Sequence, residues 1–457
     1  MDAIETFARH VVESRFEDLD ETARAATRTF LLDGLGVAVA GSAGPWVREL
    51  IESQHLWGRG EDATVWISGE RLPAPAAAMV NAYQQHNSEY DAVHEAAVVH
   101  ALTVVLPVAM VEVERGHREG RPVSGRDFLL ALALGVDVAA GLGVAATSTM
   151  RFFRPGTAGG FGGVAAMGRL RGFDAATLVN AFSALYGQLG GSMQAHSEGS
   201  MLLAMQIGFN ARNAVVACDL AARGLEGPKQ VLEGPFGFFN LIEPAHRLPE
   251  ILPTLGRIWR IAEMAHKPYP SGRATHGVLD AVLALQQRLN LASEDIASVR
   301  CAVPPLTYGL VGRPVRDDMA PNYARLCARY VAALALVRRG RIEVADFASP
   351  DRFDPDALAL ARRIEIDADE NPDVNALAPV TVALATHDGR HDRETVSEVY
   401  GSPARPMSRE AHLDKFRRNC TGASRPLTPE RQERLIETVD ELETLEDAAD
   451  LVRLMRA

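Results

Sequence analysis

The chain has 457 residues, of which 47% are hydrophobic, 23% charged and 6% aromatic. This composition is typical of a folded globular protein and excludes a disordered, collagen-like or coiled-coil chain. The net charge of −12, without a basic stripe, argues against a nucleic-acid partner. The four cysteines are far apart and form neither a disulfide framework nor a zinc-ribbon pattern.

Two features bear on localisation. The N-terminus is polar and amphipathic, unlike a signal peptide. The longest apolar run, residues 128–147, has the length of a membrane span, but it contains Asp137 and many small residues. Neither a Lys/Arg asymmetry nor an aromatic belt flanks it, so we expect a helix buried between other helices. The sequence therefore predicts a cytoplasmic protein that does not bind a membrane.

Residues 1–265 carry mostly helix signals. Asp20 is a good N-cap for a helix that we expect to end at Gly34 or Gly36. Ser124 and Asp127 resemble a capping box ahead of a second helix. Helices are predicted over residues 21–36, 75–85, 128–143, 175–191 and 209–227. Their Ala- and Gly-rich composition predicts close helix-to-helix contacts.

The pattern changes at about residue 266, and residues 266–401 are predicted to form an α+β domain. Asp388-Gly389 is a strong hairpin signal between two apolar-polar alternating runs. The predicted strands are residues 296–303, 364–367 and the two arms of 379–396, with helices over 274–290 and 322–340. The chain then becomes helical again, and Thr428-Pro429 is a good N-cap and N1 pair for the last helix.

A first polar cluster lies in residues 86–100, which contain three His and several carboxylate or amide groups. The stretch His94–His100 looks like a stretched zincin motif. However, its two His are six residues apart and point about 120° from each other on a helix, which disfavours a metal site. Acid/base catalysis is one interpretation, since His and carboxylates can be tuned towards neutral pH. A solvated loop between helices is the other.

A second feature is the glycine-rich segment 151–163, which contains Arg151 and Arg154. It follows no strand and does not match GxGxxG, which disfavours a dinucleotide site. Exposed backbone N–H groups at a helix start, together with the two arginines, would suit a carboxylate. Alternatively, the glycines only allow two helices to pack closely.

A third feature is the segment 266–276 at the expected domain boundary. It contains Lys267, one of only three lysines among 47 basic residues, beside Arg273 and two His. Ligand sites tend to form in clefts between domains, although a Pro- and Gly-rich linker would look similar. No GxSxG elbow or catalytic-looking Cys supports a nucleophilic triad.

Several long motifs, in the same order along nearly the whole chain, resemble those of the MmgE/PrpD family. This family includes 2-methylcitrate dehydratase, cis-aconitate decarboxylase and iminodisuccinate epimerase. The motifs are LLDGLGVAVAGS, AAAMVNAYQQHNSEYDAVHE, GTAGGFGGVAAMGRLRGFD, the segment GSMLLAMQIGFNARN with its continuation to GPFGFF, HKPYPSGRATHGVLDA and HLDKFRRNC.

The resemblance implies a large all-helical domain of residues 1–265 and 402–457, a smaller lid-like α+β domain of residues 266–401, and a homodimer. It also implies a cofactor-free and metal-free site between the domains. There, acid/base residues would dehydrate, decarboxylate or epimerise a small organic acid next to a carboxylate or carbonyl. Such chemistry needs cations to stabilise enolate-like charge and one base.

The chain departs from the family pattern at several positions. The family's first active-site Asp is Glu89 here, its Thr is Val93, and its Lys of the GSM motif is Leu203. Further departures are Arg154 and Gln206, each in place of a family His, and Gly272 in place of the His that some decarboxylases carry. These losses indicate a divergent member that acts on a less anionic or differently shaped substrate.

We therefore expect an enzyme, a lyase or isomerase. The candidate catalytic residues are Glu89, Asp91, His94, His100, Lys267 and His276, and the candidate substrate-binding residues are Arg151, Arg154, Gln206, Arg273 and Tyr269. The alternative is a family fold that has lost catalysis and serves as a binding or scaffold protein. A cleft filled by Leu203, Met205 and other apolar residues would favour that alternative.

Overall fold

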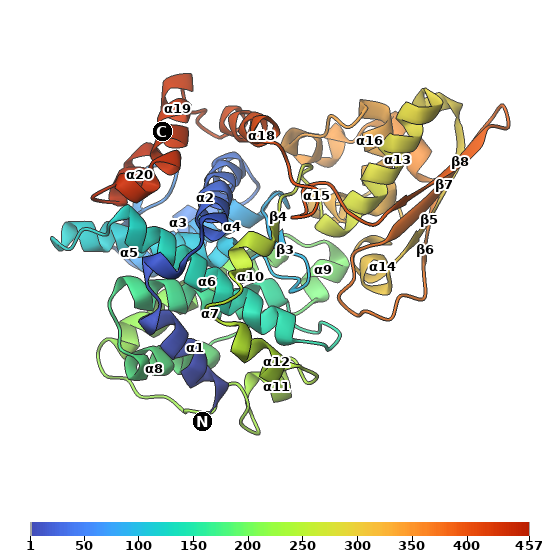
Figure 1. Cartoon of the computed structure of the whole chain (residues 1–457). Coiled ribbons are helices and arrows are strands. Elements are labelled where there is room, and N and C mark those ends of the chain that lie inside the picture. Colours follow the sequence, from blue (N-terminus) through green and yellow to red (C-terminus); the bar gives the residue numbers. More distant parts are fainter. Residues whose placement is uncertain (1, 457) are drawn as a thin grey trace.

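The first part of the chain is a helical assembly around α6 and α7 (Figure 1). The structure is a computed structural model that describes residues 2–456. The helices of this part are α1 (Ala3–Glu13), α2 (Glu21–Gly41), α3 (Val47–Trp57), α4 (Ala74–His86), α5 (Leu102–Arg118), α6 (Gly125–Ala145), α7 (Arg154–Leu170), α8 (Ala175–Tyr186), α9 (Gln194–Glu198), α10 (Leu202–Ala221), α11 (Phe238–Leu241) and α12 (Leu248–Ile251). Two short antiparallel pairs lie in the connections: β1 (Ala63–Thr64) with β2 (Arg71–Leu72), and β3 (Val93–His94) with β4 (Met264–Ala265).

Two of the predicted helix N-caps are confirmed. The side chain of Asp20 accepts a hydrogen bond from the backbone N–H of Ala23 at 2.7 Å, at the start of α2. The Ser124 hydroxyl accepts one from the backbone N–H of Asp127 at 3.1 Å, at the start of α6. Each cap satisfies a backbone donor that has no partner inside the helix.

The predicted end of α2 at Gly34 or Gly36 is wrong, because the helix continues to Gly41. Both glycines lie where other helices approach closely. A Cβ on Gly34 would lie 2.7 Å from Nε2 of Gln85, and a Cβ on Gly36 would lie 2.7 Å from Cδ2 of Phe416. These glycines therefore allow α4 and the later helix α18 (Arg409–Thr421) to contact α2, and packing outweighs their poor helix propensity.

The apolar run 128–147 begins within α6 and is a core element. Among the described residues, α6 alone has the length and hydropathy of a membrane span, and 94% of its most apolar window is buried inside the protein. Glycines bring α6 and α7 together, since a Cβ on Gly162 would lie 2.4 Å from the carbonyl oxygen of Gly135. The glycine-rich segment thus packs α7 closely against α6.

The second part of the chain combines helices with a four-stranded sheet in the order β6-β5-β7-β8. The β5–β6 pair is parallel and the other pairs are antiparallel. The predicted hairpin is confirmed, with Gly389 at φ +89° in the turn between β7 and β8. The strands are β5 (Ile296–Val303), β6 (Ile364–Ala368), β7 (Val380–Thr386) and β8 (His391–Val396), and the helices are α13 (His276–Leu289), α14 (Pro305–Val311), α15 (Pro321–Arg325), α16 (Ala328–Arg338) and α17 (Pro355–Ala361).

The last helices return to the first part of the chain. They are α18 (Arg409–Thr421), α19 (Pro429–Asp440) and α20 (Ala449–Leu454). Helices α18 and α19 pack on α2, and α20 packs on α5, so the C-terminal helices join the assembly of the N-terminal helices (Figure 1). Buried apolar residues form one large cluster from these elements and the N-terminal helices, and a second cluster between the four-stranded sheet and its helices. The protein is mainly helical with small sheets.

Candidate active site

The polar segment that follows α4 forms a buried turn beside the KPYP segment. Helix α4 ends at His86, and Glu89 adopts φ +53°, a left-handed conformation that is costly for a residue with a side chain. Strand β3 then pairs with β4, with Val93 opposite Ala265. Because Lys267 follows β4 by two residues, this short pairing brings it next to Glu89.

Lys267 holds the two acidic residues of the turn together. Its ammonium lies 3.1 Å from Oε2 of Glu89 and 3.9 Å from Oδ1 of Asp91. It also donates to the backbone carbonyl of Glu89 at 3.2 Å. The Lys267 side chain is fully buried, and Glu89 and Asp91 are almost fully buried. A buried charge needs such partners, since solvent cannot stabilise it.

Asp91 also contacts two histidines. Its Oδ1 accepts a hydrogen bond from Nδ1 of His86 at 3.0 Å. Its Oδ2 lies 2.5 Å from Nδ1 of His100, although the angle of this contact falls outside good hydrogen-bond geometry. The centres of the two imidazole rings are 5.0 Å apart. One carboxylate therefore contacts two histidines and orients His86 by a hydrogen bond, an arrangement typical of an acid/base site.

The electrostatic environment gives these groups different protonation. Burial opposes charge on Glu89, but Lys267 and the histidines lower its pKa to about 2. Burial likewise opposes charge on His86, but Asp91 and Glu89 raise its pKa above the ordinary value. Burial lowers the pKa of His100, and the attraction of Asp91 does not overcome this. His86 is thus biased towards the protonated form and His100 towards the neutral form.

This cluster borders a small cavity with a volume of about 60 Å³. The polar groups that line it include His86, Glu89, His100 and Arg273. The rest of the lining is mostly apolar: Val93, Val98, Met150, Phe153, Pro155, Met193, Leu203, Leu310, Val311, Leu326 and Leu377. Elements from both parts of the chain meet here, and Leu203 belongs to the lining whereas Met205 does not.

The candidate substrate-binding residues of the glycine-rich segment and of α10 lie away from this lining. Arg154 is fully buried and forms a two-pronged ion pair with Glu243, with Nε 2.7 Å from Oε1. Arg151 is exposed to solvent. Gln206 is buried and packs against Gly191, and its Nε2 has no partner within residues 2–456.

The candidate residues of segment 266–276 lie closer to the cavity. Arg273 lines it, but its Nε donates to Oε1 of Glu95 at 2.7 Å. His276 is fully buried behind Arg273, where burial and that guanidinium lower its pKa well below the usual range. Tyr269 packs against His276, with ring centres 5.5 Å apart. His94 is buried, and its Nε2 lies 2.9 Å from Glu263.

Sequence reasoning did not select His86 or His196, although both line the cavity. His86 is the first residue of the polar segment 86–100. Its position at the end of the predicted helix would have identified it as a candidate site residue. His196 lies in α9 without a recognisable motif. Burial and the neighbouring Arg313 lower the pKa of His196 to about 4. The Nη2 group of Arg313 donates to the His196 carbonyl at 3.0 Å.

Among the described residues, two groups of side chains have the donor types and the proximity that a metal ion needs. In each group, potential ligand atoms lie within 4.8 Å of one another. They are His86 with Asp91 and His100, and Asp33 with His266 and His412. The zincin-like pair, which its spacing disfavoured, is in different contacts, since His94 contacts Glu263 and His100 contacts Asp91.

Comparisons with known proteins cover almost the whole chain. The MmgE/PrpD N-terminal domain matches residues 5–250 and the MmgE/PrpD C-terminal domain matches residues 269–444. Similar proteins include the cis-aconitate decarboxylases of Mus musculus (27% identical; 99% of this chain and 93% of the relative), Homo sapiens (28%; 99% and 94%) and Aspergillus terreus (26%; 96% and 93%). These findings confirm the family resemblance seen in the sequence motifs. The chain belongs to the MmgE/PrpD family.

Proposed function

We propose that this protein is a lyase or isomerase that moves a proton at the carbon next to a carboxylate or carbonyl of a small organic acid. The observation that supports this proposal is the buried cluster in which Asp91 is hydrogen-bonded to His86 and lies 2.5 Å from His100, beside the cavity. Family membership and the decarboxylase names of the relatives favour dehydration or decarboxylation over other chemistry.

The different pKa shifts of the two histidines suggest their roles. His100 is biased towards the neutral form, so it is the candidate general base. His86 is biased towards the protonated form and can return a proton as the general acid. Environments that shift the pKa values of two titratable groups in opposite directions are typical of acid/base pairs. The ammonium of Lys267, held in place by Glu89, would stabilise the negative charge that develops on the substrate oxygen.

The cations around the cavity favour a substrate with fewer carboxylates than a tricarboxylate. Arg273, which lines the cavity, is neutralised by Glu95, and Arg154, which lies outside the lining, is neutralised by Glu243. At the position of the family's Lys, the cavity is lined by Leu203. A second or third carboxylate would therefore be desolvated without a partner, which costs several kcal/mol.

A direct test is to screen small mono-, di- and tricarboxylic acids with the purified protein and to follow their conversion by NMR. Replacing the proposed base, His100→Asn, should lower turnover of any substrate found by about 10²–10⁴-fold. The matched control is His55→Asn, because His55 is half exposed and paired only with Glu70. Equal turnover in both variants would contradict the proposed role of His100.

The alternative, a binding or scaffold protein without catalysis, is favoured by one observation. The cavity is small and largely apolar, with Leu203 in its wall. This alternative predicts that an acid which stabilises the protein is not converted, even at long incubation. Loss of the same stabilisation in His100→Asn would then locate the bound acid at this cavity.

A further inference from the structure

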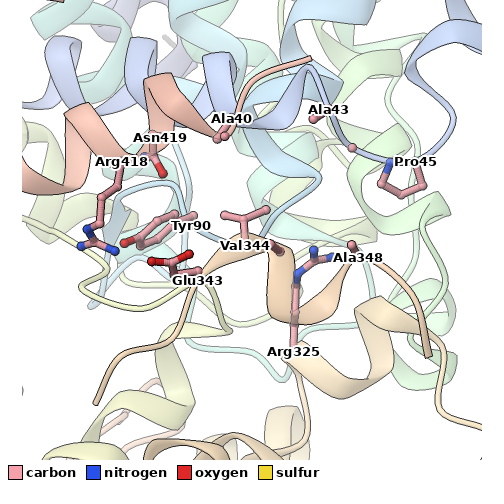
Figure 2. A pocket seen from close by; sticks show the side chains of 13 residues that line it. Ala40, Ala43, Pro45, Tyr90, Arg325, Glu343, Val344, Ala348, Arg418 and Asn419 are labelled. Carbon is pink, nitrogen blue, oxygen red and sulfur yellow. The ribbon is translucent and has the colours of Figure 1, made fainter. Parts of the chain in front are cut away.

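A second and larger cavity, of about 320 Å³, lies next to the candidate active site (Figure 2). Its volume falls within the range of about 300–1,000 Å³ that is usual for small-molecule sites. The end of α2, helix α18 and the 3-10 helix Val344–Phe347 surround it. Tyr90 lines this cavity, whereas its neighbour in the chain, Glu89, lines the catalytic one.

Arg325 is a buried cation at the wall of this cavity. Its side chain rises from the end of α15, and its guanidinium lies beside Val344 and Ala348 (Figure 2). Arg325 is 2% exposed, yet within residues 2–456 it forms no ion pair, and its Nε has no hydrogen-bond partner. One group, Nη1, donates to the carbonyl of Asn87 at 3.3 Å. A buried charge with so few partners is costly unless an anion completes the site.

Asn419 also extends from α18 into the same cavity and is 4% exposed, with its side-chain oxygen towards the cavity (Figure 2). Arg418 lies at the rim, where it is paired with Asp414. Ala40 and Ala43 add apolar surface on the same side as Asn419, and the opposite wall carries the exposed residue Glu343 and apolar surface from Val344 and Ala348 (Figure 2).

We propose that this cavity binds a small organic carboxylate, with its oxyanion on Arg325 and its short carbon chain on the alanine and valine surface. The planar fork of a guanidinium matches a carboxylate in a two-pronged contact. Burial of the carboxylate would then supply the counter-charge that Arg325 lacks among residues 2–456.

An occupied cavity would act on the catalytic turn. Arg325 donates to the carbonyl of Asn87, and Tyr90 lies between Glu89 and Asp91 in the chain. The ligand would therefore contact the segment that positions both catalytic carboxylates. This site is separate from the proposed acid/base cavity, and its existence does not depend on the reaction proposed above.

Butyrate and inorganic phosphate are suitable probes, with calorimetry and thermal shift as readouts. We expect butyrate to bind saturably to the wild-type protein and to His100→Asn, which alters only the other cavity. Arg325→Gln should weaken butyrate binding at least tenfold. Ala348→Phe should weaken butyrate binding to a similar extent, because the larger side chain fills the cavity. Since Ala348 is exposed, this variant should fold, and it tests the proposal even if Arg325→Gln does not fold.

Three results would overturn the proposal. The first is a lack of saturable butyrate binding. The second is that Ala348→Phe binds butyrate with wild-type affinity while His100→Asn loses butyrate binding, which would place the ligand in the catalytic cavity. The third is tighter, Arg325-dependent binding of phosphate than of butyrate, which would replace the carboxylate with a phosphate ligand.

Discussion

Replacing the buried ammonium of Lys267 by an apolar side chain of similar length, Lys267→Met, should destabilise the protein strongly. The ammonium lies 3.1 Å from a carboxylate oxygen of Glu89 and 3.9 Å from one of Asp91. The fall in the pKa of Glu89 from 4.5 to about 2 corresponds to about 3 kcal/mol of stability at neutral pH. Breaking a buried ion pair by removing one partner typically costs a similar amount, about 3–5 kcal/mol.

The stability lost in Lys267→Met should be larger at pH 8 than at pH 5. In the wild-type protein, the folded-state pKa of Glu89 is depressed, so its contribution is complete above pH 4.5 and is lost as the pH falls towards 2. In Lys267→Met, burial raises the pKa of Glu89, because the main opposing cation has been removed. The folded variant then takes up a proton more readily at pH 5 than at pH 8, and the stability difference from wild type should shrink towards pH 5.

Urea unfolding, followed by fluorescence between pH 5 and pH 8, measures this difference. Lys229→Met is the matched control, since Lys229 is exposed, and it should change the free energy of unfolding by less than about 0.5 kcal/mol. Adding Glu89→Gln to Lys267→Met should recover much of the loss, because the uncompensated charge is then absent. A loss below about 1 kcal/mol, or no recovery in the double variant, would refute the reasoning.

Three further predictions concern the same region. Turnover should follow a bell-shaped pH profile, falling at acidic pH as His100 becomes protonated and at alkaline pH as His86 loses its proton; a flat profile from pH 5 to pH 9 would contradict these roles. Arg154→Met should lower the free energy of unfolding by about 3–5 kcal/mol, because it leaves Glu243 buried without its ion-pair partner. Calorimetry or urea unfolding would measure this change. An unchanged stability together with weaker substrate binding would instead support a role of Arg154 in substrate binding. Leu203→Lys should lower the Kd of a tricarboxylate about tenfold or more relative to wild type, measured by titration calorimetry, and an unchanged Kd would mean that this wall does not face the substrate carboxylates.

Local features of the sequence predicted several elements of the fold. The N-caps Asp20 and Ser124 and the hairpin turn at Gly389 depend on a few neighbouring residues, so they could be identified directly. The end of α2 could not, because the roles of Gly34 and Gly36 depend on helices that are distant in the chain. In the sequence, a glycine is compatible both with a helix end and with a close contact between helices. Only its neighbours in space distinguish the two.

The candidate site also combines features that the sequence predicts with features that only the tertiary structure determines. The polar segment 86–100 stood out because it concentrates histidines and carboxylates, and Lys267 stood out as one of only three lysines and was also matched by the family's KPYP motif. The sequence left open whether this segment is a solvated loop or a buried cluster. The structure buries it, since β3 pairs with β4 and places Lys267 against Glu89 across a separation of 178 residues.

By itself, the sequence determined the helix caps, the hairpin, the family and the concentration of acid/base groups, because each depends on neighbouring residues or on motif order. Only the tertiary structure decided which charges are free. It pairs Arg154 with Glu243 and Arg273 with Glu95, and it leaves the buried Arg325 without an ion pair among the described residues. Charge neutralisation requires atoms within about 4 Å of each other, and this proximity is created by packing between distant segments.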